Sequence, residues 1–503
     1  MTLYLGVDCG TQSTKVLVLD TQNERILGQA SAPHQIISDT NGKREQLAEW
    51  WTTAFSEAFN EVLTRNKIDS RRIRAIGISG QQHGFVPLDV DGNVIAPVKL
   101  WCDTETVIQN ELLIECLGGQ SSAFKKLGII PQTGFTVSKI LWFKQKYPEL
   151  WNKLDKILLP HDYLNYWLTG KLSMEFGDAS GTGLLNVIDK KWNLEVLATI
   201  SSEQDVLALL PQLSEAQKVI GTVSAEIAKK FNLDPSTKVS TGGGDNMMAA
   251  IGTGNIEPGI TTMSLGTSGT IFTYSDTPVV NQSQSIAQFC SSTNGWLPLI
   301  CTMNVTSATS SIQELFKKDI EQFNSAISSA NPGADGITIL PFFNGERTPD
   351  LPTAKGSIHG IDLTNLSESN LCRAVIESAT YGLKYGIELF IREGIQVEEI
   401  RLIGGGSKSQ IWREIVANVT GKPVVSVINE EAAALGAAIQ AVWCDTFDEN
   451  LNEFNQLKAL TDKYVTLDET SRIFPNKELS ESYAKLYQNY LKLLKHNFPE
   501  VTV

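Results

Sequence analysis

A strand, a short polar turn and a second strand open the chain, and the same unit occurs again half a chain later. Residues 3–20 read LYLGVDCGTQSTKVLVLD, in which alternating apolar residues lead to Asp8 and an apolar run follows the bend. Residues 263–274, MSLGTSGTIFTY, repeat this order, and Gly266-Thr267 aligns with Gly10-Thr11. This repeat favours a duplicated domain, with a ligand held between the two copies. Two unrelated Gly-Thr turns are the alternative.

The first bend carries the groups that a phosphate site needs. Its sequence, GTQST, offers backbone N–H groups and hydroxyls to phosphate oxygens. Asp8 supplies the oxygen ligands that Mg²⁺ prefers, and Lys15 supplies a positive charge nearby. An ordinary hairpin turn with a solvated aspartate is the alternative. The second copy of the unit favours a nucleotide bound between the two halves.

Length and composition restrict the class of protein. A chain of 503 residues is too long for a single hydrophobic core and has the length of two domains. We expect these domains to be residues 1–253 and 254–503. No apolar segment is long enough to span a bilayer, and no secretory signal precedes the first strand. We therefore expect no membrane partner.

The positions of the cysteines and the net charge restrict the class of protein further. The seven cysteines are scattered without any CxxC pair, which predicts free thiols in the cytoplasm and neither zinc nor disulfides. The net charge of −14 argues against nucleic acid as a partner. Any anionic substrate must then be held by local groups, because the overall field repels it.

Three further segments of the first half end in polar or glycine-rich loops. An expected strand at 73–79 leads into GQQHG, and LWCD occupies 100–103. Residues 239–254, VSTGGGDNMMAAIGTG, predict a short strand, a glycine loop and a helix that starts near Asp245. One alternative is that Asp245 is simply the N-cap of that helix and has no further role. Three glycines before it, however, allow the backbone to approach something closely.

The second half contains a comparable loop. Residues 400–421 predict a strand, the turn GGGSKS and a helix from Gln410, an arrangement that can admit an adenosine phosphate. The helix at 431–441, EAAALGAAIQA, is so rich in small residues that it must pack very close to a neighbour. Elsewhere, we expect a helix over 44–62 and largely helical structure over 107–240.

Taken together, these motifs resemble the FGGY family of carbohydrate kinases over nearly the whole chain. In order, they are GVDCGTQSTK (6–15), GISGQQHG (77–84), LWCD (100–103), GGGDN (242–246), SLGTSG (264–269) and GGGSKSQIWR (404–413), followed by the small-residue helix. Each motif alone is weak. Their common order in a chain of this length makes the resemblance specific.

The resemblance implies a fold and a reaction. The fold is α/β, with two related domains of the actin and hexokinase (ribonuclease H-like) type and the active site in the cleft between them. The reaction is transfer of phosphate from ATP, with Mg²⁺, to the terminal hydroxyl of a sugar. Within the family the motifs are most similar to those of kinases acting on the ketopentose D-xylulose.

The resemblance also assigns residues. Asp245 is the expected general base, and Asp8 the expected metal ligand. Contacts to the sugar hydroxyls are expected from Gln82, His83, Asp103, Asp245 and Asn246. Contacts to the nucleotide are expected from Gly10, Thr11, Ser13, Lys15, Gly266, Thr267, Gly405, Gly406, Ser407 and Gln410.

Other functions stay open at this point. The sugar could instead be D-ribulose, another ketose or a polyol. A catalytically silent sugar- or nucleotide-binding protein would be expected to have lost the base, whereas Asp245 is present. An actin- or chaperone-like ATPase would not need QQHG or GGGDN. The sequence leaves the oligomeric state open, with a homodimer among the alternatives.

Overall fold

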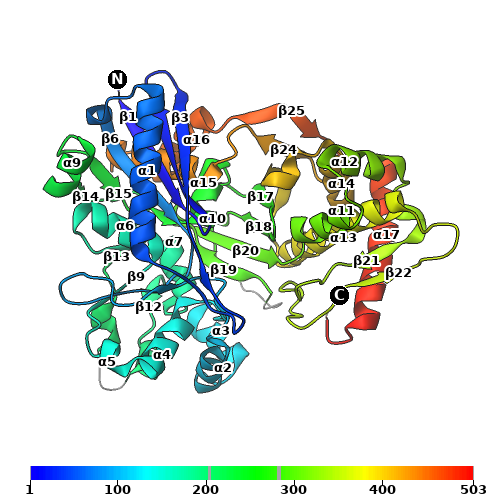
Figure 1. The fold of residues 1–503 in the computed structure, drawn as a ribbon, viewed down its shortest axis with the longest axis horizontal. Coiled ribbons are helices and arrows are strands. Elements are labelled where there is room, and N and C mark those ends of the chain that lie inside the picture. Colours follow the sequence, from blue (N-terminus) through cyan, green and yellow to red (C-terminus); the bar gives the residue numbers. More distant parts are fainter. Residues whose placement is uncertain (1, 202–204, 280–284, 502–503) are drawn as a thin grey trace.

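The computed structural model describes residues 2–201, 205–279 and 285–501, and within them two large sheets form the centres of two halves (Figure 1). The first sheet has the spatial order β14 (Val219–Thr222), β15 (Lys238–Ser240), β6 (Ile73–Gly80), β1 (Leu3–Cys9), β2 (Ser13–Asp20) and β3 (Arg25–Pro33), with β16 (Gly243–Gly244) paired to β6. The second has the order β19 (Ala287–Cys290), β20 (Trp296–Thr302), β18 (Gly269–Thr273), β17 (Gly259–Leu265), β23 (Val397–Ile403), β24 (Val424–Val427) and β25 (Leu467–Ile473).

The two sheets repeat one topology, as the duplicated hairpin predicts. In the first, β1, β2 and β3 are antiparallel neighbours, while β6 and then β15 continue the sheet in parallel from β1. In the second, β17, β18 and β20 are antiparallel neighbours, and β23 and then β24 continue in parallel from β17. Three residues separate the paired strands in both hairpins, 10–12 and 266–268. The expected α/β fold of two related domains is confirmed.

Helices and short strands surround these sheets. The helices before the glycine loop are α1 (Ala48–Asn66), α2 (Val107–Cys116), α3 (Gln120–Leu127), α4 (Thr136–Lys146), α5 (Pro148–Trp151), α6 (Pro160–Thr169), α7 (Phe176–Ala179), α8 (Leu194–Ile200) and α9 (Ala225–Phe231). The later ones are α10 (Asp245–Gly252), α11 (Thr306–Leu315), α12 (Ile320–Ser329), α13 (Glu368–Arg392), α14 (Gln410–Thr420), α15 (Ala432–Thr446), α16 (Glu453–Tyr464) and α17 (Lys477–Asn497). The short strands are β4 (Ile37–Ser38), β5 (Arg44–Gln46), β7 (Val86–Leu88), β8 (Val98–Lys99), β9 (Lys156–Leu158), β10 (Met174–Glu175), β11 (Leu185–Asn186), β12 (Lys191–Trp192), β13 (Leu213–Ser214), β21 (Thr338–Leu340) and β22 (Ser357–His359).

Two expectations for local structure need correction. The helix expected over 44–62 begins only at Ala48, because residues 44–46 form β5 and pair with β8. The segment 107–240 is mixed, since the short strands β9 to β13 and the main-sheet strands β14 and β15 alternate there with α2 to α9. Tertiary pairing decides both cases, and a local pattern does not report it.

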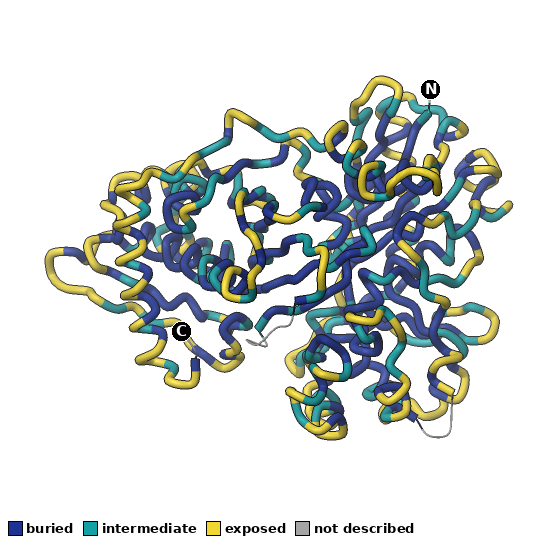
Figure 2. The backbone as a smooth tube through the Cα atoms, turned by 180° about the vertical axis from the view of Figure 1, so that it is seen from behind, coloured by how far each residue is buried: buried dark blue, intermediate teal, exposed yellow. Residues whose placement is uncertain are grey.

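Strand β1 is buried along its whole length because both of its faces are covered. Leu3, Leu5 and Val7 pack in one hydrophobic cluster with Trp51 of α1. The alternate residue Tyr4 points to the opposite face and packs in the cluster formed by α15. Figure 2 shows the resulting pattern, with dark buried strands at the centre and exposed loops at the periphery.

Helices α10 and α15 cross at backbone contact and join the two halves. A Cβ atom added to Gly436 of α15 would lie 1.8 Å from the carbonyl oxygen of Met248, and one on Gly252 of α10 would lie 1.8 Å from that of Ala432. Helix α15 approaches β1 as closely, since a Cβ on Gly6 would lie 1.9 Å from the carbonyl oxygen of Ala434. The small residues of α15 therefore pack very close to their neighbours, as expected.

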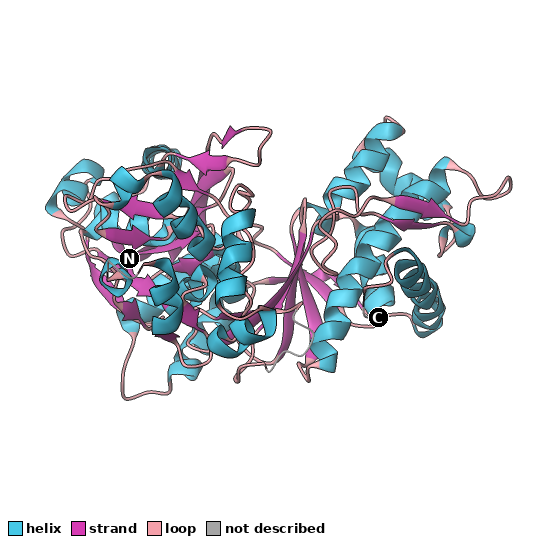
Figure 3. Ribbon diagram, turned by 90° about the horizontal axis from the view of Figure 1, so that it is seen from below, coloured by secondary structure: helices cyan, strands magenta, loops and turns pink. Residues whose placement is uncertain are grey.

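Packing across the halves continues on both sides of this crossing. Helices α15 and α16 lie in sequence between β24 and β25 of the second sheet. In the fold, however, α15 packs on β1 and β6 of the first sheet, and α16 packs beside α15 in the same hydrophobic cluster. Phe289 and Leu299 of the second sheet share a hydrophobic cluster with Phe135 of the first half. Seen from below, the second sheet lies between the helices of the two halves (Figure 3). Among the described residues, no helix is both long and apolar enough to cross a membrane.

Because the two helices are in backbone contact at this crossing, one added methyl group there should destabilise the fold. Gly436→Ala should lower the midpoint of thermal unfolding, because overpacking costs about 1–3 kcal/mol and exceeds the roughly 1 kcal/mol that alanine gains over glycine in a helix. Gly382→Ala in α13 is the matched control, since a Cβ there meets nothing within 4 Å. It should leave the midpoint unchanged or raise it. Equal midpoints for the two variants would contradict backbone contact between α10 and α15.

Candidate active site

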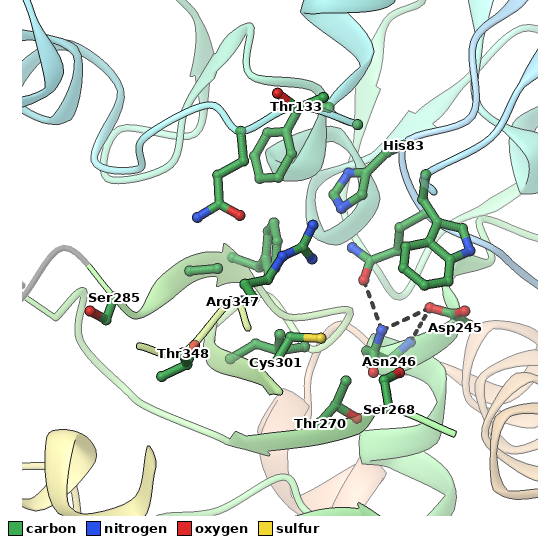
Figure 4. Close-up of a pocket in the computed structure, with 18 of the residues that line it drawn as sticks. His83, Thr133, Asp245, Asn246, Ser268, Thr270, Ser285, Cys301, Arg347 and Thr348 are labelled. Carbon is green, nitrogen blue, oxygen red and sulfur yellow. Dashed lines mark hydrogen bonds between the residues drawn. The ribbon is translucent and has the colours of Figure 1, made fainter. Parts of the chain in front are cut away.

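A cavity of about 230 Å³ lies between the two halves, close to the end of the first hairpin (Figure 4). This volume is below the ~300–1,000 Å³ usual for drug-sized ligands and suits a smaller molecule. The residues that line the cavity include Thr11, Gln82, His83, Trp101, Phe135, Asp245, Asn246, Phe289, Cys301 and Arg347. Both halves of the chain therefore contribute to one wall.

Asp245 lies in this wall as the first residue of α10. Gly244 is the N-cap residue of the helix, so the interpretation of Asp245 as an N-cap is wrong. Its Oδ1 accepts hydrogen bonds from the backbone N–H and the Nδ2 of Asn246, at 2.8 and 2.9 Å. Burial, together with the charges of Asp8 and Asp178, raises the pKa of the Asp245 carboxyl to about 7. A carboxylate with a pKa near neutrality can accept a proton from a substrate.

The glycine loop before Asp245 is held by the protein itself. A Cβ on Gly242, whose φ is +72°, would lie 2.4 Å from the carbonyl oxygen of Ile78, and one on Gly243 would lie 2.3 Å from the Ser292 Oγ. Gln440 of α15 donates from Nε2 to the Gly242 carbonyl oxygen and accepts the Gly242 N–H at Oε1, both at 2.9 Å. The close approach that the glycines allow is thus to neighbouring protein groups.

Gln82 and Asn246 form a linked polar pair in the wall. The Asn246 Nδ2 donates to the Gln82 Oε1 at 3.0 Å. Gln82 is buried, and its Nε2 has no hydrogen-bond partner among the described residues. An unpaired buried amide donor is costly, so a ligand oxygen would be favoured next to it.

His83 presents a defined hydrogen-bonding group to the cavity. Its Nδ1 lies 2.7 Å from the Gly181 carbonyl oxygen, which can only accept, so the proton is on Nδ1. Burial and the charge of Lys139 lower the pKa of His83 to about 3, so the ring stays neutral. The ring stacks on Phe135, with centroids 4.5 Å apart. Nε2 is therefore unprotonated and can act only as a hydrogen-bond acceptor.

The turn of the first hairpin lies beside Asp245. The Asp8 Oδ1 accepts from the Ser79 Oγ at 2.8 Å, and the Asp8 Oδ2 lies 3.9 Å from the Lys15 Nζ, which also pairs with Glu431 at 2.6 Å. Burial raises the pKa of Asp8. Asp8 and Lys15 therefore lie near Asp245, outside the described lining of the cavity.

Two groups of this turn are already engaged. The Gly10 N–H donates to the Ser13 carbonyl oxygen at 3.0 Å and closes the turn. The Thr11 Oγ1 donates to the Gln81 Oε1 at 3.1 Å and accepts from the Trp101 Nε1 at 2.9 Å. Thr11 belongs to the turn and also lines the cavity, together with Trp101 and Asp245.

The second turn and the GGGS loop lie against each other. The start of α11 holds the turn, since the Thr306 N–H donates to the Gly266 carbonyl oxygen at 2.9 Å. A Cβ on Gly404 would lie 2.9 Å from the carbonyl oxygen of Leu265, so the loop packs on the turn. Thr267 is exposed.

The expected adenosine side has an open surface beyond this loop. Gly405 is exposed, with open space where a Cβ would lie, while Gly406 is buried against Trp412 and Ser407 is half-buried. Gln410 is exposed at the start of α14 and donates from Nε2 to the Glu414 Oε1 at 3.0 Å. It lines a second cavity of about 360 Å³ together with Asn324.

Asp103 lies outside the described lining of the first cavity, which differs from the expectation of a sugar contact. Its side chain is fully buried, and its Oδ2 accepts from the Lys99 Nζ at 2.9 Å and the Arg44 N–H at 2.8 Å. The Lys99 ammonium also pairs with Glu45 and Glu105, so it already occupies the centre of this carboxylate group. The physical reason is charge pairing: a buried ammonium requires these carboxylates.

Trp101, Arg347 and Gln440 are among the residues of the site that the sequence motifs do not indicate. Trp101 stands inside LWCD, two positions before Asp103, and its indole N–H is a hydrogen-bond donor that the motif already contains. Arg347 stands in a polar loop, GERTP, that carries no periodic signal. Gln440 is a polar residue within a run of small and apolar residues, a pattern that indicates a buried polar contact.

Family models match both halves of the chain. The N-terminal domain model of the FGGY family of carbohydrate kinases matches residues 3–252, and the C-terminal domain model of the same family matches residues 261–444.

Curated relatives and solved structures are similar over almost the whole chain. Xylulose kinase of Haemophilus influenzae is 49% identical over 97% of this chain and 99% of its own length. Xylulose kinase of Bacillus subtilis is 31% identical over 99% and 97%. The crystal structure of xylulose kinase from Bifidobacterium adolescentis has a TM-score of 0.81 at 29% identity, covering 96% of this chain and 99% of that one. Ligand-bound xylulose kinase from Lactobacillus acidophilus, at 24% identity, has the same fold, with a TM-score of 0.90 and 99% coverage of both chains.

Proposed function

The chain belongs to the FGGY family of carbohydrate kinases, and we propose that it transfers the γ-phosphoryl group of ATP to the terminal O5 of D-xylulose. The observation that carries the proposal is the cavity between the halves, with a carboxyl group of pKa about 7 in its wall. The choice of sugar is supported by relatives named xylulose kinase at up to 49% identity.

We assign the general base to Asp245. As the terminal sugar oxygen attacks the γ-phosphorus in line, its proton passes to the Asp245 carboxylate, and the bond to the leaving ADP oxygen breaks. Phosphoryl transfer requires mainly positioning and charge neutralisation, so a fixed base and nearby cations are sufficient machinery. The hydrogen bonds from Asn246 and the support of the loop by Gln440 hold the base in place.

The nucleotide would lie along the two turns and the GGGS loop. The first turn would contribute Gly10, Thr11, Ser13 and Lys15, the second Gly266 and Thr267, and the loop Gly405, Gly406, Ser407 and Gln410. The exposure of Thr267 and Gly405 and the packing of the loop on the second turn support one continuous site. Because Gly10 closes its own turn, side chains and the remaining N–H groups would make the phosphate contacts there.

Asp8 fits a role with Mg²⁺. Its Oδ2 is free of hydrogen bonds among the described residues, and a carboxylate oxygen is the ligand type that Mg²⁺ uses together with phosphates. Burial raises the pKa of Asp8 in spite of the Lys15 ammonium beside it, so a further cation would stabilise the carboxylate. When bound, the ion would neutralise charge on the phosphates; Lys15 does so from the chain itself.

The sugar hydroxyls would form hydrogen bonds with Gln82, His83 and Asn246. The Gln82 Nε2 offers a free donor and the His83 Nε2 a free acceptor. Asp103 as a direct sugar contact stays a prediction, and its ion pair with Lys99 favours a supporting role.

We further propose a division of the chain at 253/254 and a cytoplasmic location. The seven cysteines, all free in the structure, support a reducing compartment. Whether the protein is a monomer or a homodimer is a question for light scattering.

An ADP-release assay over a panel of pentuloses, hexuloses and polyols tests the function. D-Xylulose should give the highest kcat/KM, at least roughly tenfold above its C3 epimer D-ribulose, because a misplaced hydroxyl leaves polar groups of the site unpaired. ADP release without sugar serves as the blank. A higher value for D-ribulose or a polyol would overturn the sugar and leave the kinase. Release independent of every sugar would overturn the kinase.

A pH profile tests the base. Since Asp245 must be deprotonated to accept a proton, kcat/KM should fall about tenfold per pH unit below pH 7 and level off above it. Asp245→Asn should lower kcat by about 10²–10⁴-fold. It should not lower the unfolding midpoint at pH 8, because it removes a carboxylate that burial and Asp8 disfavour. Near-parental turnover, or an unchanged pH profile, would contradict the assignment.

A further inference from the structure

Arg347 is a cation in the sugar cavity for which the proposed mechanism has no use. It lies in the loop that follows β21 in the second half, and Figure 4 shows its guanidinium group pointing into the cavity toward His83. Among the described lining residues it is the one lysine or arginine. In a chain of net charge −14, a cation aimed into the ligand space needs an explanation.

The carboxylate next to Arg347 in sequence does not pair with its guanidinium group. Glu346 is buried, and its Oε1 accepts the N–H groups of Met303 and Arg347 at 2.6 and 2.8 Å. Its Oε2 accepts from the Asn304 Nδ2 at 3.1 Å. These bonds fix the loop on the segment that follows β20. The charge of Glu346 is thereby committed to the backbone, and the guanidinium group remains for the cavity.

In the described part of the chain, the guanidinium charge of Arg347 has no balancing carboxylate. Among the described residues, no carboxylate lies within ion-pair distance of Arg347. Its guanidinium group contacts the Cys301 thiol, which is a weak acceptor. A guanidinium group has five N–H donors and no acceptor, so its unused donors favour an oxygen of the ligand.

His83 offers the opposite chemistry on the facing side. Its Nδ1 proton is engaged by the Gly181 carbonyl oxygen, so Nε2 can only accept. Its own carbonyl oxygen accepts from the Lys139 Nζ at 2.7 Å and the Thr136 Oγ1 at 3.1 Å, which fixes the residue at a positive φ of 65°. An obligate acceptor and a fork of obligate donors thus face the same space from different halves of the chain.

This pairing matches one chemical pattern among sugars. An obligate acceptor favours a hydroxyl group, which donates. A donor fork favours a carbonyl oxygen, which accepts twice and brings no proton. A hydroxyl in place of that carbonyl could still accept from the guanidinium group, but it would bring a proton that needs an acceptor, and the adjacent hydroxyl already uses the His83 Nε2. The two residues together therefore suit a hydroxyl beside a carbonyl, which is an α-hydroxy ketone.

We propose that Arg347 binds the carbonyl oxygen of the ketose while His83 accepts from the adjacent hydroxyl, so that this pair selects ketoses over polyols. The proposal rests on the proposed function and adds the residue that recognises the ketone. It places the carbonyl end of the sugar away from Asp245. It also ties the sugar to both halves, since Arg347 comes from the second and His83 from the first.

The test compares a ketose with its reduced form in three variants. Arg347→Met keeps the bulk of the side chain without donors, and Arg347→Lys keeps the charge without the fork. Arg392→Met, half-exposed on α13 and remote from the cavity, removes the same charge as a matched control. For each protein, KM and kcat for D-xylulose, the KM for ATP, the unfolding midpoint and the affinity for xylitol, as substrate or competitive inhibitor, are measured.

Arg347→Met should raise the KM for D-xylulose about 10- to 100-fold, the range expected for losing a hydrogen bond to a charged group. Its affinity for xylitol should change less than about threefold, and its KM for ATP and unfolding midpoint should match those of the control. Arg347→Lys should lie between the two.

Equal losses for D-xylulose and xylitol, or no loss for either, would overturn the role of Arg347 while leaving the kinase intact. If Arg347→Met does not fold, the same comparison in Arg347→Lys decides. A parent protein that phosphorylates no ketopentose would instead overturn the proposed function, whatever the variants do.

Discussion

The crossing of α10 and α15 at backbone contact is the constraint on which the rest of the structure depends. Gly252 and Gly436 leave no room for a methyl group at the crossing, so the halves have one way to pack there. Helix α10 begins with Asp245, and α15 carries Gln440, which holds the loop before it. The same contact that joins the halves therefore aims the carboxyl group into the cavity between them. The duplicated topology supplies one hairpin turn in each half.

Charge gives the site its chemical character. Asp8, Asp178 and Asp245 lie close enough in buried surroundings for their charges to raise the pKa of the Asp245 carboxyl to about 7. A carboxylate made unfavourable in this way gains by accepting a proton. The same negative surroundings would require cations wherever phosphates bind, and the Lys15 ammonium lies 3.9 Å from the Asp8 carboxylate. At the other side of the cavity Arg347 has no carboxylate partner among the described residues, which leaves it available to a neutral, oxygen-rich ligand.

Much of the fold was predictable because it depends on local patterns. Two hairpins of equal turn length, a glycine loop before Asp245 and a helix of small residues each report their own backbone geometry. The remaining features depend on contacts between distant segments. Asp103 looked like a ligand contact, but the buried Lys99 four residues earlier engages its carboxylate. Arg347 enters the cavity because Glu346 is tied to the segment after β20, and no periodicity in the sequence reports that tie. The tautomer of His83 likewise depends on the distant Gly181 carbonyl.

The central claim is the orientation of the sugar, with its carbonyl end at His83 and Arg347 and its far end at Asp245. D-Xylulose has a primary hydroxyl at each end, on C1 and on C5, so chemistry alone does not choose between them. The most direct measurement is the carbon NMR spectrum of the product formed from D-xylulose and ATP, in which phosphorus splits the signals of the carbons next to it. With the sugar in this orientation, phosphorus should split the signals of C5 and C4. Splitting at C1 and C2 would contradict it, because the carbonyl end would then have lain beside the base.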